Sequence, residues 1–157
     1  MLLPASVYAL STDRHQPIKI KADSVYLNEK TGISIYKGNV IFVQGSLILK
    51  GNRVEVYQPK GTVSKIIVTG NPARFQQQQD NVKELVHAEA GKMEFITKDE
   101  RVYLSQNAFV SQGENLLKGN KIEYNTRTST ISAKGKDKGN RVTTVIEPDS
   151  QKTPNNQ

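Results

Sequence analysis

The chain repeats itself, and this repeat limits the possible folds more than any other feature of the sequence. Residues 39–56 align without a gap with residues 107–124, and eight of the 18 aligned positions are identical. Chance would give about one or two identities, so we interpret the repeat as an internal duplication. A duplicated set of short elements cannot bury its apolar face alone and must continue onto its neighbour, which predicts an elongated, stacked architecture.

Each copy has the pattern of β-structure. Apolar and polar residues alternate with period two, as in half-buried strands, in segments 18–21, 33–35, 53–56 and 121–124. Both residues of a Gly-Asn pair accept the positive φ of tight turns, and such pairs begin at positions 38, 51, 70, 119 and 139. We therefore predict an all-β fold in which these pairs connect successive short strands.

Composition narrows the class of protein further. The 157 residues suit one domain, and only 36% of them are hydrophobic, so the core should be thin. The net charge of +7 favours anionic partners such as phosphorylated lipid, an acidic membrane surface or nucleic acid. Because no run of five or more basic residues concentrates this charge, we expect no nucleic-acid partner. Cysteine is absent, which excludes disulfides and thiolate chemistry.

The two ends of the chain differ in composition from its middle. We interpret residues 1–9 as the remnant of a signal peptide, because this apolar segment ends in the small-x-small sequence Val7-Tyr8-Ala9. Residues 10–15 are expected to be a mobile lead-in, residues 16–146 the β domain, and residues 147–157 a disordered tail. These boundaries predict an exported protein, with an ordinary apolar N-terminus as the alternative.

No constellation of residues has the spacing that catalysis requires. Gln44-Gly45-Ser46 lacks the full context of a nucleophile elbow, and His15 and His87 are the only imidazoles. His87 falls on the outward parity of a strand, which favours a solvated surface side chain. The sequence therefore predicts a protein that is not an enzyme and that has no cofactor and no metal site.

The sequence feature that does indicate a function is a stripe of apolar residues that follows the period-two alternation of the strands. One explanation is an ordinary filled core. The other is a lipid-binding trough, because a sheet folded over itself without closing leaves an interior that a ligand can reach. Both explanations stay open at this point. The stripe consists of Ile18, Ile20, Ile35, Val40, Phe42, Leu49, Val54, Val56, Phe75, Met93, Phe95, Val110, Leu117, Ile122 and Tyr124.

Several segments resemble a known family in their order and spacing. They are Gln16-Pro-Ile-Lys-Ile20, Gly38-Asn-Val-Ile41, Val43-Gln-Gly45, Asn71-Pro-Ala-Arg-Phe75, Lys118-Gly-Asn-Lys-Ile122 and residues 137–145. Together they span about residues 16–146 and are similar to the OstA-like family of periplasmic lipopolysaccharide-transport proteins.

The resemblance implies an elongated open β-jellyroll of about sixteen short antiparallel strands, located in the periplasm. It implies that the chain binds lipopolysaccharide and stacks end to end with an LptC-like inner-membrane protein, an LptD-like outer-membrane protein or further copies of itself. The alternative is a β scaffold of the same architecture that binds no lipid.

The resemblance also implies which residues meet these partners. The N-terminal partner edge corresponds to Ile18, Lys19, Ile20 and Lys21. The C-terminal edge corresponds to about residues 121–145, including Lys121, Arg141 and Val142. Lipid-contacting positions of the family correspond to Ile18, Ile20, Phe75, Met93 and Phe95, whereas the other stripe residues are assigned from their parity alone.

Overall fold

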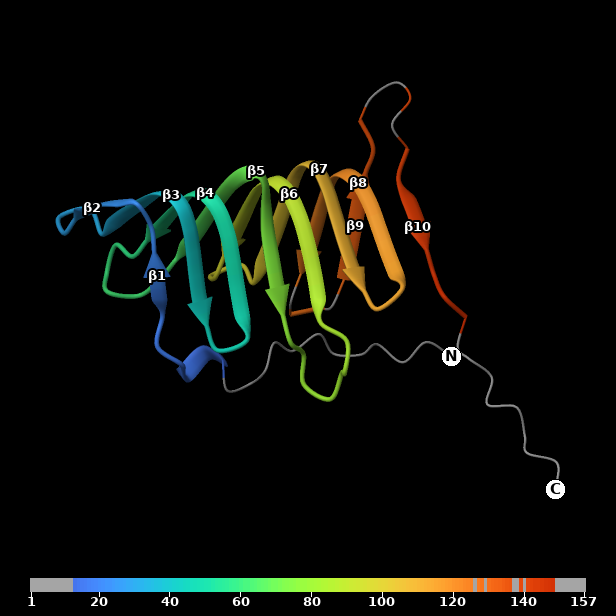
Figure 1. Cartoon of the computed structure of the whole chain (residues 1–157), viewed down its shortest axis with the longest axis horizontal. Coiled ribbons are helices and arrows are strands. Elements are labelled where there is room, and N and C mark those ends of the chain that lie inside the picture. Colours follow the sequence, from blue (N-terminus) through green and yellow to red (C-terminus); the bar gives the residue numbers. More distant parts are fainter. Residues whose placement is uncertain (1–12, 126, 129, 137–138, 140, 149–157) are drawn as a thin grey trace.

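The computed structural model describes residues 13–125, 127–128, 130–136, 139 and 141–148 (Figure 1). The expected signal remnant, the start of the lead-in and most of the tail lie outside the described residues. The described part contains a short 3-10 helix, η1 (Asp13–His15), and ten strands. The strands are β1 (Lys19–Lys21), β2 (Ser24–Asn28), β3 (Ile33–Gln44), β4 (Leu47–Tyr57), β5 (Lys65–Gln77), β6 (Val86–Ile96), β7 (Arg101–Gln112), β8 (Asn115–Asn125), β9 (Thr130–Lys134) and β10 (Thr143–Val145). In this part of the chain, no helix has the length and apolar character needed to cross a membrane.

All ten strands belong to one antiparallel sheet, which confirms the predicted all-β class. Strands β3 to β8 follow one another as neighbours in chain order. At one end, β1 pairs with residues 41–43 of β3 and β2 pairs with residues 33–37 of the same strand. At the other end, β10 pairs with residues 116–118 of β8 and β9 with residues 121–125. Each end of the sheet therefore carries two short edge strands.

The Gly-Asn pairs that begin at 38, 51, 70 and 119 lie inside strands, so the prediction that they connect strands is wrong. Each pair coincides with a shift in the register between neighbouring strands, where the chain bends and then continues. A bulge needs the same backbone freedom as a turn, and Gly38 and Asn39 adopt φ values of 81° and 43°. The expected sixteen or so short strands are therefore corrected to ten among the described residues, six of them with 11 to 13 residues.

The bends fold the sheet into two layers. In Figure 1 the long strands arch over along one line, so that half of each strand lies in the front layer and half in the fainter rear layer. We call this line the crease, and buried Ala73, Ala90 and Ala108 lie beside its register shifts. A Cβ added at Gly51 would lie only 2.6 Å from the carbonyl oxygen of Thr69. At these positions the crease therefore depends on residues with little or no side chain, whereas the bend of β7 uses Gln106 and Asn107 with positive φ.

The inward-facing side chains of the two layers form the core, and the core is filled most completely over β3 to β6. Phe42, Leu49, Val54, Val68 and Met93 each have an exposed fraction of 0%. Protein interiors reach close packing by interdigitating such side chains. For the stripe residues Phe42, Leu49, Val54 and Met93, the filled-core explanation is therefore correct.

Ile35, which was expected in the inward-facing stripe, lies on the outer face. It pairs with Glu55 on β4, and directly opposed residues share a face. The next residue, Tyr36, packs against the core instead. This part of β3 has large apolar side chains on both of its faces. Period-two alternation alone therefore could not show which of them point inward.

Glu55 shows how the outer face holds its charges. Its carboxylate accepts hydrogen bonds from Arg53 Nε at 2.8 Å and from the Tyr57 hydroxyl at 2.7 Å. Burial raises the pKa of Glu55, but the hydrogen bonds from Tyr57 and Arg53 and the charge of Arg53 outweigh burial, so the pKa lies below its ordinary value. The outer face is thus a polar surface organised by pairs of neighbouring side chains.

Replacement of Gly51 by alanine should destabilise the fold by roughly 1–3 kcal/mol, because the new Cβ fits only if the backbone of β5 moves. Urea denaturation measures the free energy of unfolding. The control is Asn52→Ala, which changes the adjacent exposed side chain and should alter stability by no more than ~0.5 kcal/mol. Equal stabilities for the two variants would contradict the close approach at the crease.

Candidate functional site

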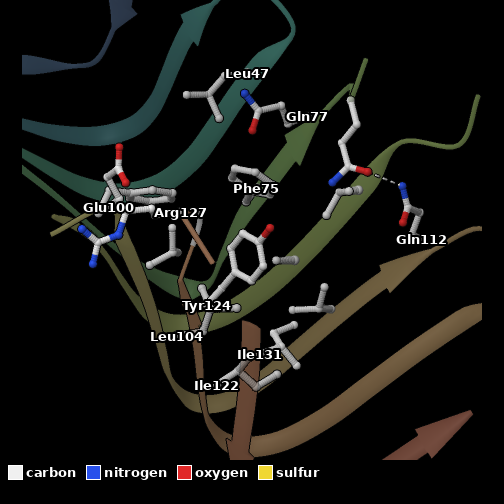
Figure 2. Close-up of a pocket in the computed structure, with 16 residues that line it drawn as sticks. Leu47, Phe75, Gln77, Glu100, Leu104, Gln112, Ile122, Tyr124, Arg127 and Ile131 are labelled. Atoms are coloured by element: carbon white, nitrogen blue, oxygen red, sulfur yellow. Dashed lines mark hydrogen bonds between the residues drawn. The ribbon is translucent and has the colours of Figure 1, made fainter. Parts of the chain in front are cut away.

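The interior is not filled along its whole length. Over β5 to β8 a cavity of about 520 Å³ opens between the two layers (Figure 2). Its lining residues are Leu47, Phe75, Gln77, Gln79, Val86, Ala88, Phe95, Glu100, Val102, Leu104, Val110, Gln112, Ile122, Tyr124, Arg127 and Ile131.

Two phenylalanines stand where the filled core meets the cavity. Phe75 on β5 and Phe95 on β6 approach each other from different layers and stack, with ring centroids 6.0 Å apart and planes inclined by 26°. Phe75 lies opposite the fully buried Leu49 on one side and opposite Ala88 on the other. The drop in side-chain size from leucine to alanine opens the space beyond the aromatic pair.

The walls beyond the aromatic pair are apolar. Val102 and Leu104 project from β7, and Ile122 and Tyr124 project from β8. Figure 2 shows the ring of Tyr124 projecting into the cavity between Phe75 and Leu104. Ile131 on β9 completes the wall and is 49% exposed at the end of the sheet. An apolar ligand would find aliphatic and aromatic surface on both sides of this space.

The polar lining residues come from the free ends of the strands, away from the crease. Gln77 and Gln112 end β5 and β7, and the Gln112 amide donates a hydrogen bond of 2.7 Å to Gln79 Oε1, drawn dashed in Figure 2. Glu100 and Arg127 follow β6 and β8. The cavity therefore has apolar walls and a polar rim, as suits an amphipathic ligand. Within the described residues, no three histidine, aspartate or glutamate side chains gather in a way that could hold a metal ion.

The helix η1 is fastened to this rim by a buried carboxylate. Asp13 is 5% exposed and accepts hydrogen bonds from the backbone N–H and the hydroxyl of Ser46, at 2.9 Å and 2.5 Å. The Gln77 side chain donates a third, longer bond of 3.4 Å. Residues 13–15 of the expected lead-in thus hold the β3–β4 turn beside the cavity.

The structure divides the thirteen predicted ligand-binding residues into three groups. Four line the cavity, namely Phe75, Phe95, Ile122 and Tyr124. Six are buried in the core and do not line the cavity, namely Val40, Phe42, Leu49, Val54, Val56 and Met93. The other three are Ile18, which is 43% exposed, Ile20, which packs against the core from β1, and outward-facing Ile35. Lipid contact by any of them stays a prediction.

Most of the second wall and the whole rim were not among the residues predicted from the sequence. Val102 and Leu104 alternate with polar neighbours in Arg101–Gln112, so the same periodicity that identified the stripe could have found them. The rim glutamines carried no such signal, because only the folded sheet brings the ends of β5 and β7 together.

The exposed large apolar side chains lie at the two ends of the sheet. Among the described residues, they are Ile18, Val25, Tyr26, Leu27 and Ile41 at the first end, and Ile131, Val142, Val145 and Ile146 at the other. The expected edge residues Lys19, Lys21, Arg141 and Val142 are exposed in these regions. Lys121 is a correction, because it pairs with Ser105 on one side and Lys134 on the other and is therefore not on an edge strand.

Replacement of Ala88 by leucine should fill part of the cavity. Binding of the apolar dye N-phenyl-1-naphthylamine should fall, while the free energy of unfolding should change by less than about 1.5 kcal/mol, because the added side chain enters empty space. Fluorescence titration and urea denaturation measure the two quantities. Ser111→Leu, on the outer side of β7 opposite His87, is the control and should leave dye binding unchanged. A dye that binds both variants equally would place its site elsewhere.

Comparison with known proteins agrees with this architecture. Residues 19–130 match the model of the family described as LptA/(LptD N-terminal domain) LPS transport protein. The lipopolysaccharide export system protein LptH of Pseudomonas aeruginosa is 36% identical over 136 residues, covering 86% of this chain and 77% of that protein. LptA of Escherichia coli K12 is 36% identical over 159 residues, covering 99% of this chain and 85% of that protein.

A solved structure extends the agreement from sequence to fold. The crystal structure of LptH from Pseudomonas aeruginosa superimposes with a TM-score of 0.78 at 32% identity and covers 87% of this chain and 99% of that one. LptH is described as the LptA-homologous periplasmic component of a lipopolysaccharide transport device. Sequence and fold together show that this chain belongs to the LptA/LptD N-terminal domain family of lipopolysaccharide transport proteins.

Proposed function

We propose that this protein binds the acyl chains of lipopolysaccharide in the cavity and forms part of a periplasmic bridge that carries the lipid from the inner to the outer membrane. The observation that carries the proposal is the apolar cavity with a polar rim, within the fold of a lipopolysaccharide-transport family. The protein needs no catalytic residue for this role, because the cavity guides the lipid and the energy for directional transport comes from other components.

The hydrophobic effect makes it unfavourable for the acyl chains of a lipid to cross water unprotected, and an apolar cavity removes this cost. Each buried CH₂ group is worth ~0.8 kcal/mol, so a chain of about a dozen methylenes would lose roughly 10 kcal/mol on entering water. A cavity of about 520 Å³ lies within the range of ~300–1,000 Å³ that is typical of small-ligand sites. It therefore accommodates part of a lipid with several acyl chains, while the phosphorylated sugars stay at the polar rim in water.

The alternative function is a scaffold that binds no lipid. The packed part of the core over β3 to β6 is the observation that favours it. Phe42, Leu49 and Met93 leave no exposed surface there for a ligand to contact. The proposal is therefore that acyl chains lodge beyond the aromatic pair, over β5 to β8, and that the first part of the sheet acts as a rigid support.

The variant Phe95→Glu should abolish binding of lipopolysaccharide and leave the fold intact, because it places a charge in the wall of the cavity. Phe75→Glu, which alters the other ring of the pair, should have the same effect. Native mass spectrometry and photocrosslinking with added lipopolysaccharide measure binding, and circular dichroism reports the fold.

The matched control is Ile41→Glu, which adds the same charge on the outer face of β3, where exposed Ile41 lies opposite Lys21 and Lys50. This variant should keep its lipid. Unchanged binding in a folded Phe95→Glu protein would count against the cavity and in favour of the scaffold.

The two open ends support the proposed end-to-end assembly. Edge strands offer unpaired backbone groups to further strands, and such pairing is normally suppressed unless it is used. Here both ends also expose apolar side chains, including Val25 and Leu27 on β2 and Val145 on β10. We assign the β1 and β2 end to an LptC-like partner, and the β9 and β10 end to an LptD-like partner or to another copy of this chain.

The double variant Val25→Asp with Leu27→Asp should weaken self-association by tenfold or more without lowering the melting temperature of the dilute, unassociated protein, because both side chains are more than half exposed. Sedimentation velocity at increasing protein concentration measures association. Thr69→Asp with Ser105→Asp adds the same charge on central strands of the outer face and should associate normally. If both double variants associate alike, the β2 edge is not the interface.

A further inference from the structure

A second hollow lies on the outer face of the sheet. It has a volume of about 930 Å³, and its lining includes Glu89, Asn107, Phe109, Lys118, Asn120 and Arg141. We call it the outer groove. Phe109 lies opposite Glu89 on β6 and Lys118 on β8, and Lys118 lies opposite Thr143 on β10, so one row of outward side chains forms its floor.

The sheet itself separates the outer groove from the apolar cavity. Val110, which follows Phe109 on β7, lines the cavity on the inner face. Successive side chains of a strand point to opposite faces, so a ligand cannot occupy both spaces without passing around the sheet. The outer groove is therefore a separate site with its own chemistry.

The charge of the outer groove is positive. Lys118 and Arg141 are exposed, and among the described residues neither forms an ion pair with a carboxylate. The carboxylate in the groove, Glu89, is paired with Arg74 at 3.0 Å, which offsets its charge. Two cations facing one space favour an anionic ligand.

The other lining residues indicate which kind of anionic ligand the outer groove would bind. The Nζ atom of Lys118 lies 5.6 Å from the centroid of the Phe109 ring, so a flat aromatic surface stands beside a cation. The negative face of such a ring attracts weakly positive C–H groups. Asn107 and Asn120 add amides that can both donate and accept hydrogen bonds, which is what hydroxyl groups require.

We propose that the outer groove binds an acidic sugar, either phosphorylated or carboxylated. Lys118 and Arg141 bind the anionic group, the ring of Phe109 supports the C–H face of the sugar, and Asn107 and Asn120 bind its hydroxyls. This site goes beyond the proposed lipid function and does not depend on it, because the two spaces lie on opposite faces of the sheet.

The test is a titration of the ¹⁵N-labelled protein, followed by NMR, with glucose 6-phosphate, glucose and inorganic phosphate. Glucose 6-phosphate should shift the amide signals of residues 107–109, 118–120 and 141–143, and should bind more tightly than either of the other two probes. Lys118→Ala with Arg141→Ala should weaken its binding by about tenfold or more, since hydrogen bonds to charged groups are the stronger ones.

The matched control is Lys37→Ala with Lys50→Ala, which removes the same charge from exposed positions outside the groove and should leave binding unchanged. Equal weakening by both double variants would overturn the site. Equal affinity for glucose 6-phosphate and inorganic phosphate, or no loss of affinity in Phe109→Leu, would overturn its assignment to a sugar.

The sugar can belong to the transported lipid or to a separate acidic glycan. A second titration therefore uses the phosphorylated oligosaccharide released from lipopolysaccharide in one arm and polygalacturonate in the other, both with the Phe95→Glu protein. Tighter binding of the first supports the lipid as source, and tighter binding of the second supports a free glycan. If neither oligosaccharide shifts the amide signals of the groove residues, the proposal fails. If the cavity binds no lipid but the groove signals still shift, only the proposed lipid function is contradicted.

Discussion

Close approach of the backbone at the crease is the constraint on which the rest of the structure depends. Six long strands bend there, and at Gly51 a Cβ would lie 2.6 Å from the carbonyl oxygen of Thr69 on the neighbouring strand. The bend of β7 instead uses Gln106 and Asn107, whose φ values of 67° and 57° are positive. Without the bends, the same strands would form a flat sheet with one apolar face in water. The bends bring the two halves of that face together, so the core, the cavity and the open mouth all follow from them.

The size of the inward side chains then decides where the folded sheet is solid and where it is hollow. One inward row runs across the strands from Phe42 and Leu49 through Phe75 to Ala88 and Val110. The large residues fill the space between the layers, and the small ones leave it open, because neighbouring backbone held by a hydrogen-bond ladder cannot collapse into the gap. A uniform fold therefore carries a rigid part and a binding part without any change in topology.

The sequence was sufficient for properties that depend on neighbours along the chain. Period-two alternation gave the strand content, and it gave Phe75, Phe95, Ile122 and Tyr124 as inward residues. It failed where a decision depends on neighbours across the sheet. Gly-Asn pairs serve bends as well as turns, Ile35 and Tyr36 are both large and apolar, and the cavity arises from side-chain volumes summed over four strands. The edge position of Lys121 failed for the same reason, because β9 covers it.

Because the sheet is folded but not closed, its outer face and its two ends both remain accessible to solvent, and they differ in chemistry. On the outer face, ion pairs such as Arg53 with Glu55 and Lys92 with Glu94 are partly exposed, and such pairs contribute only ~0–1 kcal/mol each. They keep the surface polar more than they hold it together, so stability comes from the core and the strand ladders. The ends have no such cover, since β2 and β10 expose both apolar side chains and unpaired backbone. A sheet of this kind completes its ladder only by pairing with another strand, so assembly at the ends and stability of the terminal strands should be coupled.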